Sequence, residues 1–457
     1  MKKVKVLSIL ISLLLVVSIL SACGSDDKKT VDEETTNEQT DQQEKKEDVK
    51  DDSKGSGEKV KISLLNSKGE IQAQLEESAK VFEKDTNIEL EIVPCAAGQS
   101  PFEKASSMYA SGNAPALLMI DTGDIAKFKD KLLDLSDEKW VNDVVEGALN
   151  DYKMDDGRMV GFPFAVEGFS FIYNKQILDK AVGGEFDPAS VKTRSDLEKL
   201  FKDIENSGVA PLVISPMDWS LAGHFLPISY ITQSSEGDAF DKMVQDLKEG
   251  KSDLANNDQF NGLIETFDLM KKYNIDKEDP LSGTYDRGPE LLGSGKVGIW
   301  FMGNWAWPQI AEFDTADGQY GFIPVPISDN ADDYGNSQIP VSVTKPLVLD
   351  KEQNSEEQQE AAKKFLEWIV YEDNGQDALV NNAHIIPAFK NITLEPQDPL
   401  AKSIKKYMDE GKTLDAPTLL PPDHWSQVGA SMQKYLDDQI DKAGLAKEIE
   451  DYWKTVE

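Results

Sequence analysis

Four polar side chains that can donate or accept hydrogen bonds follow two short apolar segments of the sequence. The segments span residues 60–65 and 116–120, and the side chains that follow them are Asn66, Lys68, Asp121 and Asp124. If the segments are strands of one sheet, these side chains lie beyond its carboxyl edge, where open α/β sheets bind ligands. Amide, ammonium and carboxylate groups suit a ligand with many hydroxyl groups, because each hydroxyl both donates and accepts hydrogen bonds.

A tryptophan stands in a comparable position after a third apolar segment. Trp305 follows residues 297–302 and comes two residues after Gly303, so its ring can face a cleft. The C–H faces of a sugar are flat and apolar and suit stacking on an aromatic ring, whereas its hydroxyl rim needs fixed polar groups. Trp305 and the charged side chains above therefore have the composition expected of a sugar site. The alternative is a tryptophan packed in the core, which is the role we assign to Trp307.

Other motifs that could carry chemistry lack the required spacing. The segment 293–296 (Gly-Ser-Gly-Lys) has no upstream glycine, so we interpret it as a turn before a strand and not as a phosphate-binding loop. Asp329, Asp332 and Asp333 do not have calcium-loop spacing, and the three histidines are not paired as metal ligands. We therefore expect no metal site, no cofactor and no catalytic residues. The many carboxylates leave a glycosidase pair open as an alternative.

The elements that must position these groups alternate between strand and helix. Residues 60–65, 88–93 and 116–120 are expected to be strands, with helices over 71–86 and 102–110 between them. This order indicates a parallel sheet covered by helices, which is an α/β fold. Later in the chain we expect strands at 169–173, 212–214, 297–302 and 320–325 and helices at 174–181, 195–205, 260–273, 356–370 and 436–453, with a break at Gly444.

The N-terminus predicts export and membrane attachment. Lysines at positions 2, 3 and 5 precede an apolar run over residues 6–20, which is typical of a secretory signal. At about 15 residues this run is shorter than the roughly 20 that a membrane-spanning helix needs. The residues Leu20-Ser21-Ala22-Cys23 resemble a bacterial lipobox, which implies cleavage after residue 22 and a diacyl anchor on Cys23. The alternative is an ordinary cleaved signal with an incidental cysteine.

Composition separates a tether from a folded part. Residues 23–59 are rich in charged and polar types and bury too little apolar surface to offset the entropy of ordering, so we expect a disordered acidic tether. Roughly 400 residues remain, which is enough for two lobes. With 48 basic and 83 acidic residues, the net charge is −35, which disfavours nucleic-acid binding. With Cys23 used for the anchor, we expect no intramolecular disulfide, and we expect Cys95 to be a packed thiol.

Four stretches in the folded part carry a family resemblance. They are residues 81–88 (VFEKDTNI), 109–115 (YASGNAP), 162–175 (FPFAVEGFSFIYNK) and 295–307 (GKVGIWFMGNWAW), with weaker support from 361–379 and 386–388. Ala116 stands where the family usually has Asp. In this order the stretches resemble bacterial extracellular solute-binding proteins of the sugar class (family 1), among them the maltose/maltodextrin-binding proteins. The resemblance spans most of the chain after the tether.

The resemblance implies a two-lobe, periplasmic-binding-protein-like α/β fold with a hinge and a ligand cleft between the lobes. By analogy the N-terminal lobe comprises residues 60–164 and 321–377, and the C-terminal lobe comprises 165–320 and 378–457. A hinged cleft couples ligand contacts to a closed state that an importer can recognise. The implied partners are a carbohydrate ligand and the permease subunits of an ABC importer. We expect a monomer held by its lipid on the extracellular face of a Gram-positive-like cell membrane.

The resemblance also implies roles for individual residues. Trp305 matches a sugar-stacking aromatic of the maltose-binding members, and Glu167 matches a carboxylate that accepts hydrogen bonds from hydroxyls. Trp425 matches a second stacking position, and Asp218 and Trp219 lie where those members have a carboxylate and an aromatic. The chain departs from the pattern at Ile120, which replaces an aromatic, and after Asp124, where no arginine follows. These departures put maltodextrin itself in question.

The sequence thus predicts a non-catalytic protein that binds a carbohydrate, and the ligand we expect is an oligosaccharide. One alternative keeps the binding role but changes the ligand to a polyamine or a phosphorylated polyol. More unpaired acids or more basic residues among the site's side chains would favour it. The other alternative is a surface glycoside hydrolase, which would require a working pair of carboxylates.

Overall fold

A computed structural model describes residues 59–95 and 100–456. The predicted signal segment 1–22, the predicted anchor Cys23 and all but the last residue of the predicted tether lie outside the described residues. Among the helices that are described, none has the length and apolar character needed to cross a bilayer.

The first sheet has four strands, and its three parallel strands confirm the strand–helix alternation predicted from the sequence. Its strands are β1 (Lys61–Asn66), β2 (Glu89–Pro94), β3 (Leu117–Met119) and β9 (Leu347–Leu349), in the order β2-β1-β3-β9. β9 runs antiparallel to β3. Helix α1 (Gln72–Thr86) ends where the sequence predicts, because Asn87 adopts the left-handed conformation with φ of 61° that terminates helices.

The second sheet is built around one long strand, β4 (Ala165–Asn174), in which every residue is buried. The other strands of this sheet are β5 (Ala210–Val213), β6 (Val297–Gly303), β7 (Tyr320–Ile323), β8 (Ile339–Thr344) and β10 (Thr413–Asp415). The order is β10-β8-β4-β6-β5, and β7 also pairs with β4. Of β4, the sequence predicts only residues 169–173; it predicts neither β8 nor β10.

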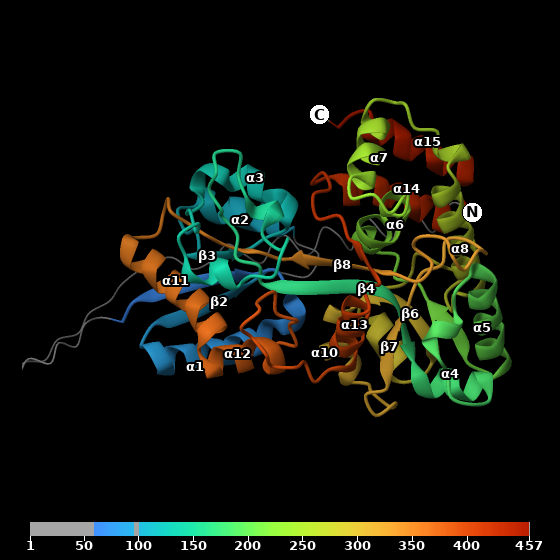
Figure 1. Cartoon of the computed structure of the whole chain (residues 1–457), viewed down its shortest axis with the longest axis horizontal. Coiled ribbons are helices and arrows are strands. Elements are labelled where there is room, and N and C mark those ends of the chain that lie inside the picture. The colour runs from blue at the N-terminus through green and yellow to red at the C-terminus, as the bar shows by residue number, and fades with distance from the viewer. Residues whose placement is uncertain (1–58, 96–99, 457) are drawn as a thin grey trace, which may run out of the picture. The chain divides into compact units, whose positions relative to one another are not determined.

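Strands β4 and β8 connect the two sheets with their helices, which we call the first and second lobes. The first four residues of β4 pair antiparallel with β8, and its later residues pair with β6 and β7. The residues just before β4 reach the first sheet, since Phe162 bridges to Leu347 of β9. Figure 1 shows β4 and β8 side by side, running from the lobe with α1 and α11 to the lobe with α4 and α5.

Helices cover both sheets. The longer ones, besides α1, are α2 (Pro101–Ala110), α4 (Lys175–Val182), α5 (Arg194–Asn206), α7 (Ala239–Lys248), α8 (Asp258–Tyr273), α11 (Glu356–Tyr371), α13 (Pro399–Asp409), α14 (His424–Leu436) and α15 (Lys442–Trp453). The short ones are α3 (Ile125–Phe128), α6 (Ile228–Ile231), α9 (Arg287–Gly293), α10 (Trp307–Ala311) and α12 (Asp373–Asp377). The α/β class predicted from the alternating elements is confirmed.

Alternation along the central strands divides the apolar residues between two cores. On β6, Trp300 and Met302 belong to the larger core, which also fills the first lobe, whereas Ile299 and Phe301 belong to the core on the opposite face of the second sheet. Successive side chains of a strand point to opposite faces, so one buried strand supplies both cores. Trp305, just beyond β6, packs against both.

The C-terminal helical region differs from the prediction. Residues 436–453 are not one helix broken at Gly444; instead α14 ends at Leu436 and α15 begins at Lys442. Asp441 caps α15 by accepting a hydrogen bond from the backbone N–H of Gly444 at 2.8 Å, so Gly444 lies in the first helical turn. The prediction of a break at Gly444 is therefore wrong, because an acidic N-cap and not the glycine sets the boundary.

The predicted lobe boundaries stay a prediction, but two neighbouring segments have defined partners. β7 begins at residue 320 and pairs with β4 in the second sheet. Residues 378–392 contribute apolar side chains to the larger core, and their backbone bridges to β4 at Val166. Both segments therefore lie beside the crossing strands.

Candidate functional site

Asn66 and Lys68 lie at the carboxyl end of β1, as the sequence predicts. The side chain of Asn66 is fully buried; it accepts a hydrogen bond from the backbone N–H of Lys68 and donates one to the carbonyl of Lys68, both at 2.9 Å. Its amide also donates to Gln72 at 2.9 Å. Since these bonds occupy its polar atoms, Asn66 fixes the turn that carries Lys68 and is a positioning residue.

Lys68 and Glu167 form a buried ion pair that joins β1 to the crossing strand β4. The side chains are only 4% and 10% exposed. Lys68 also pairs with Glu70 at 2.7 Å, and the other oxygen of Glu167 accepts a hydrogen bond from Thr344 of β8 at 2.6 Å. Burial alone would lower the pKa of Lys68, but the two glutamates raise it. Burial would likewise raise the pKa of Glu167, but Lys68 and the hydroxyl of Thr344 hold it below its usual value.

A second ion pair joins Asp121, after β3, to Lys345, directly after β8. Lys345 adopts a φ of 51°, a left-handed conformation that is uncommon for a residue with a side chain and is often retained at functional sites. Burial would lower the pKa of Lys345, but Asp121 and Glu167 raise it. Asp124 lies close by; burial and the charge of Asp121 raise its pKa to about 6.

The second lobe contributes a π-helical segment, η7 (Trp219–Phe225). Asp218 precedes it and accepts a hydrogen bond from the backbone N–H of Trp219 at 2.7 Å, so this carboxylate caps the segment. π-Helical turns are rare and occur frequently at functional sites. The segment carries Trp219 at its start and His224 near its end.

Rings from three segments of the second lobe, namely β4, η7 and the turn after β6, meet at His224. The ring centroid of His224 lies 5.0 Å from that of Trp305, 5.6 Å from that of Trp219 and 4.6 Å from that of Phe169. Tyr285 extends the group, 5.7 Å from Trp219. We call Phe169, Trp219, His224, Tyr285 and Trp305 the aromatic cluster.

Trp425 of α14 approaches the same segment from another side. A Cβ atom placed on Gly223, next to His224, would lie only 3.0 Å from the indole nitrogen of Trp425. A larger residue at position 223 would therefore displace the Trp425 ring or the π-helical segment. The structure thus brings Trp219, Trp305 and Trp425 around one stretch of backbone.

The aromatic cluster adjoins the charged groups. Glu167 and Phe169 are two residues apart on β4, and Asn304, next to Trp305, accepts a hydrogen bond from the backbone N–H of Gly168 at 2.9 Å. Burial lowers the pKa of His224 to about 4, while the carboxylates of Glu167 and Asp121 oppose this shift. Phe169, which contacts His224, lies on the same face of β4 as Glu167, so the ring and this carboxylate share one side of the strand.

A segment between β10 and α14 also reaches the first lobe. The hydroxyl of Thr418 donates a hydrogen bond to the carboxylate of Asp151, and the carbonyl of Leu420 lies 3.0 Å from the position that a Cβ atom would take on Gly123. Leu420 itself belongs to the core of the second lobe, and Tyr152, next to Asp151, belongs to that of the first. The lobes therefore touch here, close to Asp124.

All predicted residues of the folded part thus lie in or beside one region, although Asn66 and Asp218 serve to fix local backbone. Sequence reasoning missed Phe169, His224, Tyr285, Thr344 and Lys345. The position of Lys345 directly after a stretch that alternates valine with serine or threonine (Val341-Ser342-Val343-Thr344) is a usable signal, because it repeats the placement of Lys68 and Asp121 after strands. His224 gives no such signal, since its five-residue spacing from Trp219 has meaning only in a π-helix.

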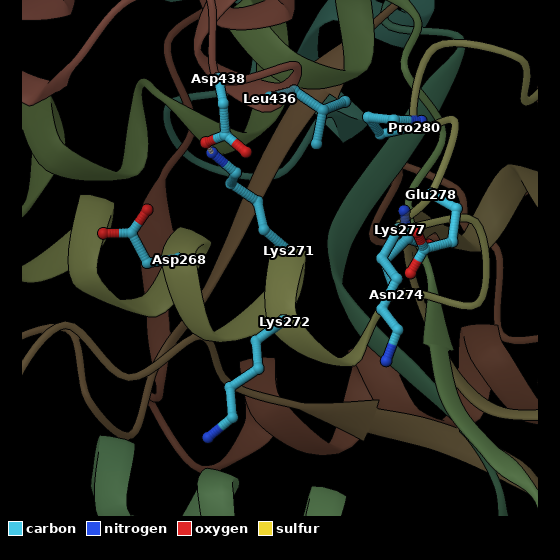
Figure 2. Close-up of a pocket in the computed structure, with 9 residues that line it drawn as sticks. All are labelled: Asp268, Lys271, Lys272, Asn274, Lys277, Glu278, Pro280, Leu436 and Asp438. Atoms are coloured by element: carbon cyan, nitrogen blue, oxygen red, sulfur yellow. Dashed lines mark hydrogen bonds and ion pairs between the residues drawn. The ribbon is translucent and has the colours of Figure 1, made fainter.

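A surface hollow elsewhere in the second lobe is a poor candidate for the site. It is lined by Asp268, Lys271, Lys272, Asn274, Lys277, Glu278, Pro280, Leu436 and Asp438, none of which was predicted from the sequence to bind ligand (Figure 2). Lys271 points toward Asp438 and is bonded to it at 2.5 Å and to the carbonyl of Tyr435 at 2.6 Å. Its lining is mostly charged and includes no aromatic ring for stacking.

Comparisons of the sequence and of the structure with known proteins all match proteins that bind or transport solutes. The model of a family described as bacterial extracellular solute-binding protein matches residues 77–409. An uncharacterised ABC transporter extracellular-binding protein from Pyrococcus horikoshii is 24% identical over 383 residues, covering 81% of this chain and 80% of the relative. The solute-binding protein RafE in complex with raffinose has a TM-score of 0.71 at 18% identity, covering 86% and 99% of the two chains. A sugar transporter protein from Bacillus licheniformis in complex with stachyose has a TM-score of 0.67 at 19% identity, covering 86% and 99%.

Proposed function

The chain belongs to the bacterial extracellular solute-binding proteins, and from this premise we propose that it binds a carbohydrate, most simply an oligosaccharide, for an ABC importer. The observation that carries the proposal is the aromatic cluster lying against one buried and one partly buried ion pair at the crossing strands. Trp305 and Trp219 offer faces for the C–H surface of a pyranose. Glu167 retains lone pairs that can accept hydrogen bonds from hydroxyls, since each carboxylate oxygen has two acceptor positions.

The pairing of both lysines of the site disfavours an anionic solute. Lys68 is neutralised by Glu167 and Glu70, and Lys345 is neutralised by Asp121. A phosphorylated polyol would need cations without partners, and a polyamine would need carboxylates without partners. Because both lysines already pair with carboxylates, a phosphorylated polyol finds no counter-charge that would offset its desolvation. The acids Glu70, Glu167, Asp121 and Asp124 outnumber the two lysines, so the titration with spermidine described below decides between a saccharide and a polyamine.

Catalysis receives less support than binding. A glycosidase needs a carboxylic acid that is protonated near neutral pH and a second carboxylate at a suitable distance. Lys68 and Thr344 hold the pKa of Glu167 low, which makes it a poor proton donor. Asp124 has a pKa raised to about 6, but its neighbour Asp121 is bound to Lys345 and is not free to act as the second carboxylate. The described relatives act in transport, and we propose that the chain is a binding protein without catalytic activity. Turnover of a panel of p-nitrophenyl glycosides would contradict this.

Titration calorimetry tests the ligand class. The purified folded part would be titrated with raffinose, stachyose, maltotriose and the chitin trisaccharide, and with spermidine and sorbitol 6-phosphate for the two rival classes. Saturable heat with at least one saccharide, and none with the charged solutes, is the expected result. Binding of spermidine or sorbitol 6-phosphate with no response to any saccharide would overturn the proposal.

We also propose that the protein is held at the extracellular face of the membrane by a lipid on Cys23, and that it acts as a monomer with two lobes joined by the crossing strands β4 and β8. The support for the anchor is the Leu-Ser-Ala-Cys sequence at the end of an apolar leader. Labelling cells with a radioactive fatty acid should mark the full-length chain and leave the Cys23→Ser variant unmarked. An unlabelled wild type, or a Cys23→Ser variant that stays equally membrane-bound, would refute the lipid anchor.

A further inference from the structure

The π-helical segment η7 brings two rings together that an α-helix would separate. Trp219 and His224 are five residues apart, which in an α-helix places them about 140° apart around the axis. Within η7 the chain instead forms hydrogen bonds of the wider turn, as between the N–H of Leu226 and the carbonyl of Leu221 at 3.0 Å. The result is a centroid distance of 5.6 Å between Trp219 and His224. The rare conformation thus serves to place this histidine.

The ring of His224 is held by aromatic neighbours and not by hydrogen bonds. It lies between Trp219, Trp305 and Phe169, which fix its plane. Within the part of the chain that the structure describes, no side chain or backbone group is hydrogen-bonded to its ring nitrogens, and the ring is partly exposed. His424 differs from His224 in its exposure, because both of its ring nitrogens are buried among aromatic rings and out of reach of solvent.

The ring is uncharged at neutral pH and faces groups of both signs. Burial lowers the pKa of His224 to about 4, and Glu167, Asp121 and Lys345 all act on it. A neutral imidazole presents one N–H donor and one acceptor nitrogen. A hydroxyl group has the same pair of functions, so a neutral histidine on an aromatic platform matches a hydroxyl attached to a ring that stacks beside it.

We propose that His224 is a specificity-determining residue, whose ring nitrogen hydrogen-bonds to a hydroxyl of the solute while Trp305 and Trp219 contact the solute's apolar faces. This inference rests on the proposed function and narrows it, because the residue selects an uncharged, hydroxyl-bearing ring system. A neutral imidazole brings no charge that could offset the desolvation of an ammonium or phosphate group.

Three variants separate hydrogen bonding from packing. His224→Phe keeps an aromatic ring within the cluster and removes both nitrogens, and His224→Gln keeps a donor and an acceptor but gives up the ring. His424→Phe is the matched control, since it makes the same exchange in a buried aromatic setting of the second lobe. We expect His224→Phe to weaken binding of the best saccharide of the panel about tenfold, His224→Gln to weaken it less, and His424→Phe to leave it unchanged.

Imidazole nitrogen resonances give a readout that packing alone does not move. The chain has only three histidines, so histidine-selective labelling with ¹⁵N gives a simple spectrum that the variants assign. Saturating saccharide should shift a ring nitrogen of His224 and leave those of His424 in place. Unchanged affinity in His224→Phe, or an unmoved His224 resonance at saturation, overturns this inference while the proposed function stands. A wild type that binds no saccharide overturns both.

Discussion

Replacing Glu167 by glutamine tests whether the buried ion pair at the crossing strands stabilises the fold. Glutamine has nearly the same shape, so its carbonyl can still accept from Lys68 while its amide donates to the hydroxyl of Thr344. What is lost is the charge opposite Lys68, whose side chain is only 4% exposed. Breaking a buried pair costs about 3–5 kcal/mol, and we expect the lower end because Glu70 remains 2.7 Å from Lys68.

The expected loss can be read as a melting temperature. For roughly 400 folded residues the unfolding entropy is about 0.8 kcal/mol/K, so about 3 kcal/mol corresponds to a decrease of about 4 °C. The matched control is Glu352→Gln, which breaks the ion pair of Lys131 and Glu352. These side chains are 34% and 46% exposed, so the melting temperature should shift by less than 1 °C. Differential scanning calorimetry at pH 7 measures both.

The pH dependence provides an internal check on the same pair. Because the folded-state pKa of Glu167 is lowered, its contribution is complete above the unfolded-state value of 4.5 and disappears as the pH falls through the folded-state value. The difference between wild type and Glu167→Gln should therefore shrink in acid. Equal shifts for Glu167→Gln and Glu352→Gln at pH 7, or a gap that widens in acid, would refute this account of the pair.

Three further results are expected. Trp305→Ala should weaken saccharide binding by about 1–3 kcal/mol in calorimetry, whereas Trp307→Ala, outside the cluster, should not; equal effects would remove Trp305 from the site. Thr418→Ala removes the hydrogen bond to Asp151 that joins the two lobes. If this bond favours the closed state, the variant should release the saccharide faster and bind it about fivefold more weakly, as measured by stopped-flow fluorescence. An unchanged dissociation rate would show that the contact does not favour closure. Burial lowers the pKa of His424 from 6.5 to about 4. Between pH 7 and pH 4 the wild type should therefore lose about 3 kcal/mol of unfolding free energy relative to His424→Phe, measured by chemical denaturation. An equal loss in the two proteins would contradict this.

Local sequence patterns predicted most of the regular structure. Apolar runs bounded by turn residues located β1, β2, β3, β6 and β7, and helical spacing located α1, α8 and α11, because these elements bury one face or stripe against a core close by in sequence. Strands β8 and β10 escaped prediction. β8 has a proline and several partly buried positions, and its pairing with β4 joins residues about 175 positions apart.

The site was predictable where strand ends or a family motif carried it. Lys68 and Asp121 follow strands, and Glu167 and Trp305 lie in long matching stretches, so the sequence could name these positions as candidates. Their partners Lys345 and Thr344 could not be, because only the crossing of β4 and β8 brings them to Glu167 and Asp121. The role of His224 could not be predicted, because its position beside Trp219 depends on a π-helical turn, and tertiary packing rather than local propensity decides where such a turn forms.

A crystal structure of the protein with its best saccharide from the calorimetric panel would test the central claim most directly. We expect a pyranose ring against Trp305, with hydroxyls within hydrogen-bonding distance of Glu167 and a ring nitrogen of His224. A saccharide held elsewhere, for example in the charged hollow beside Lys271, with the aromatic cluster unchanged, would contradict it.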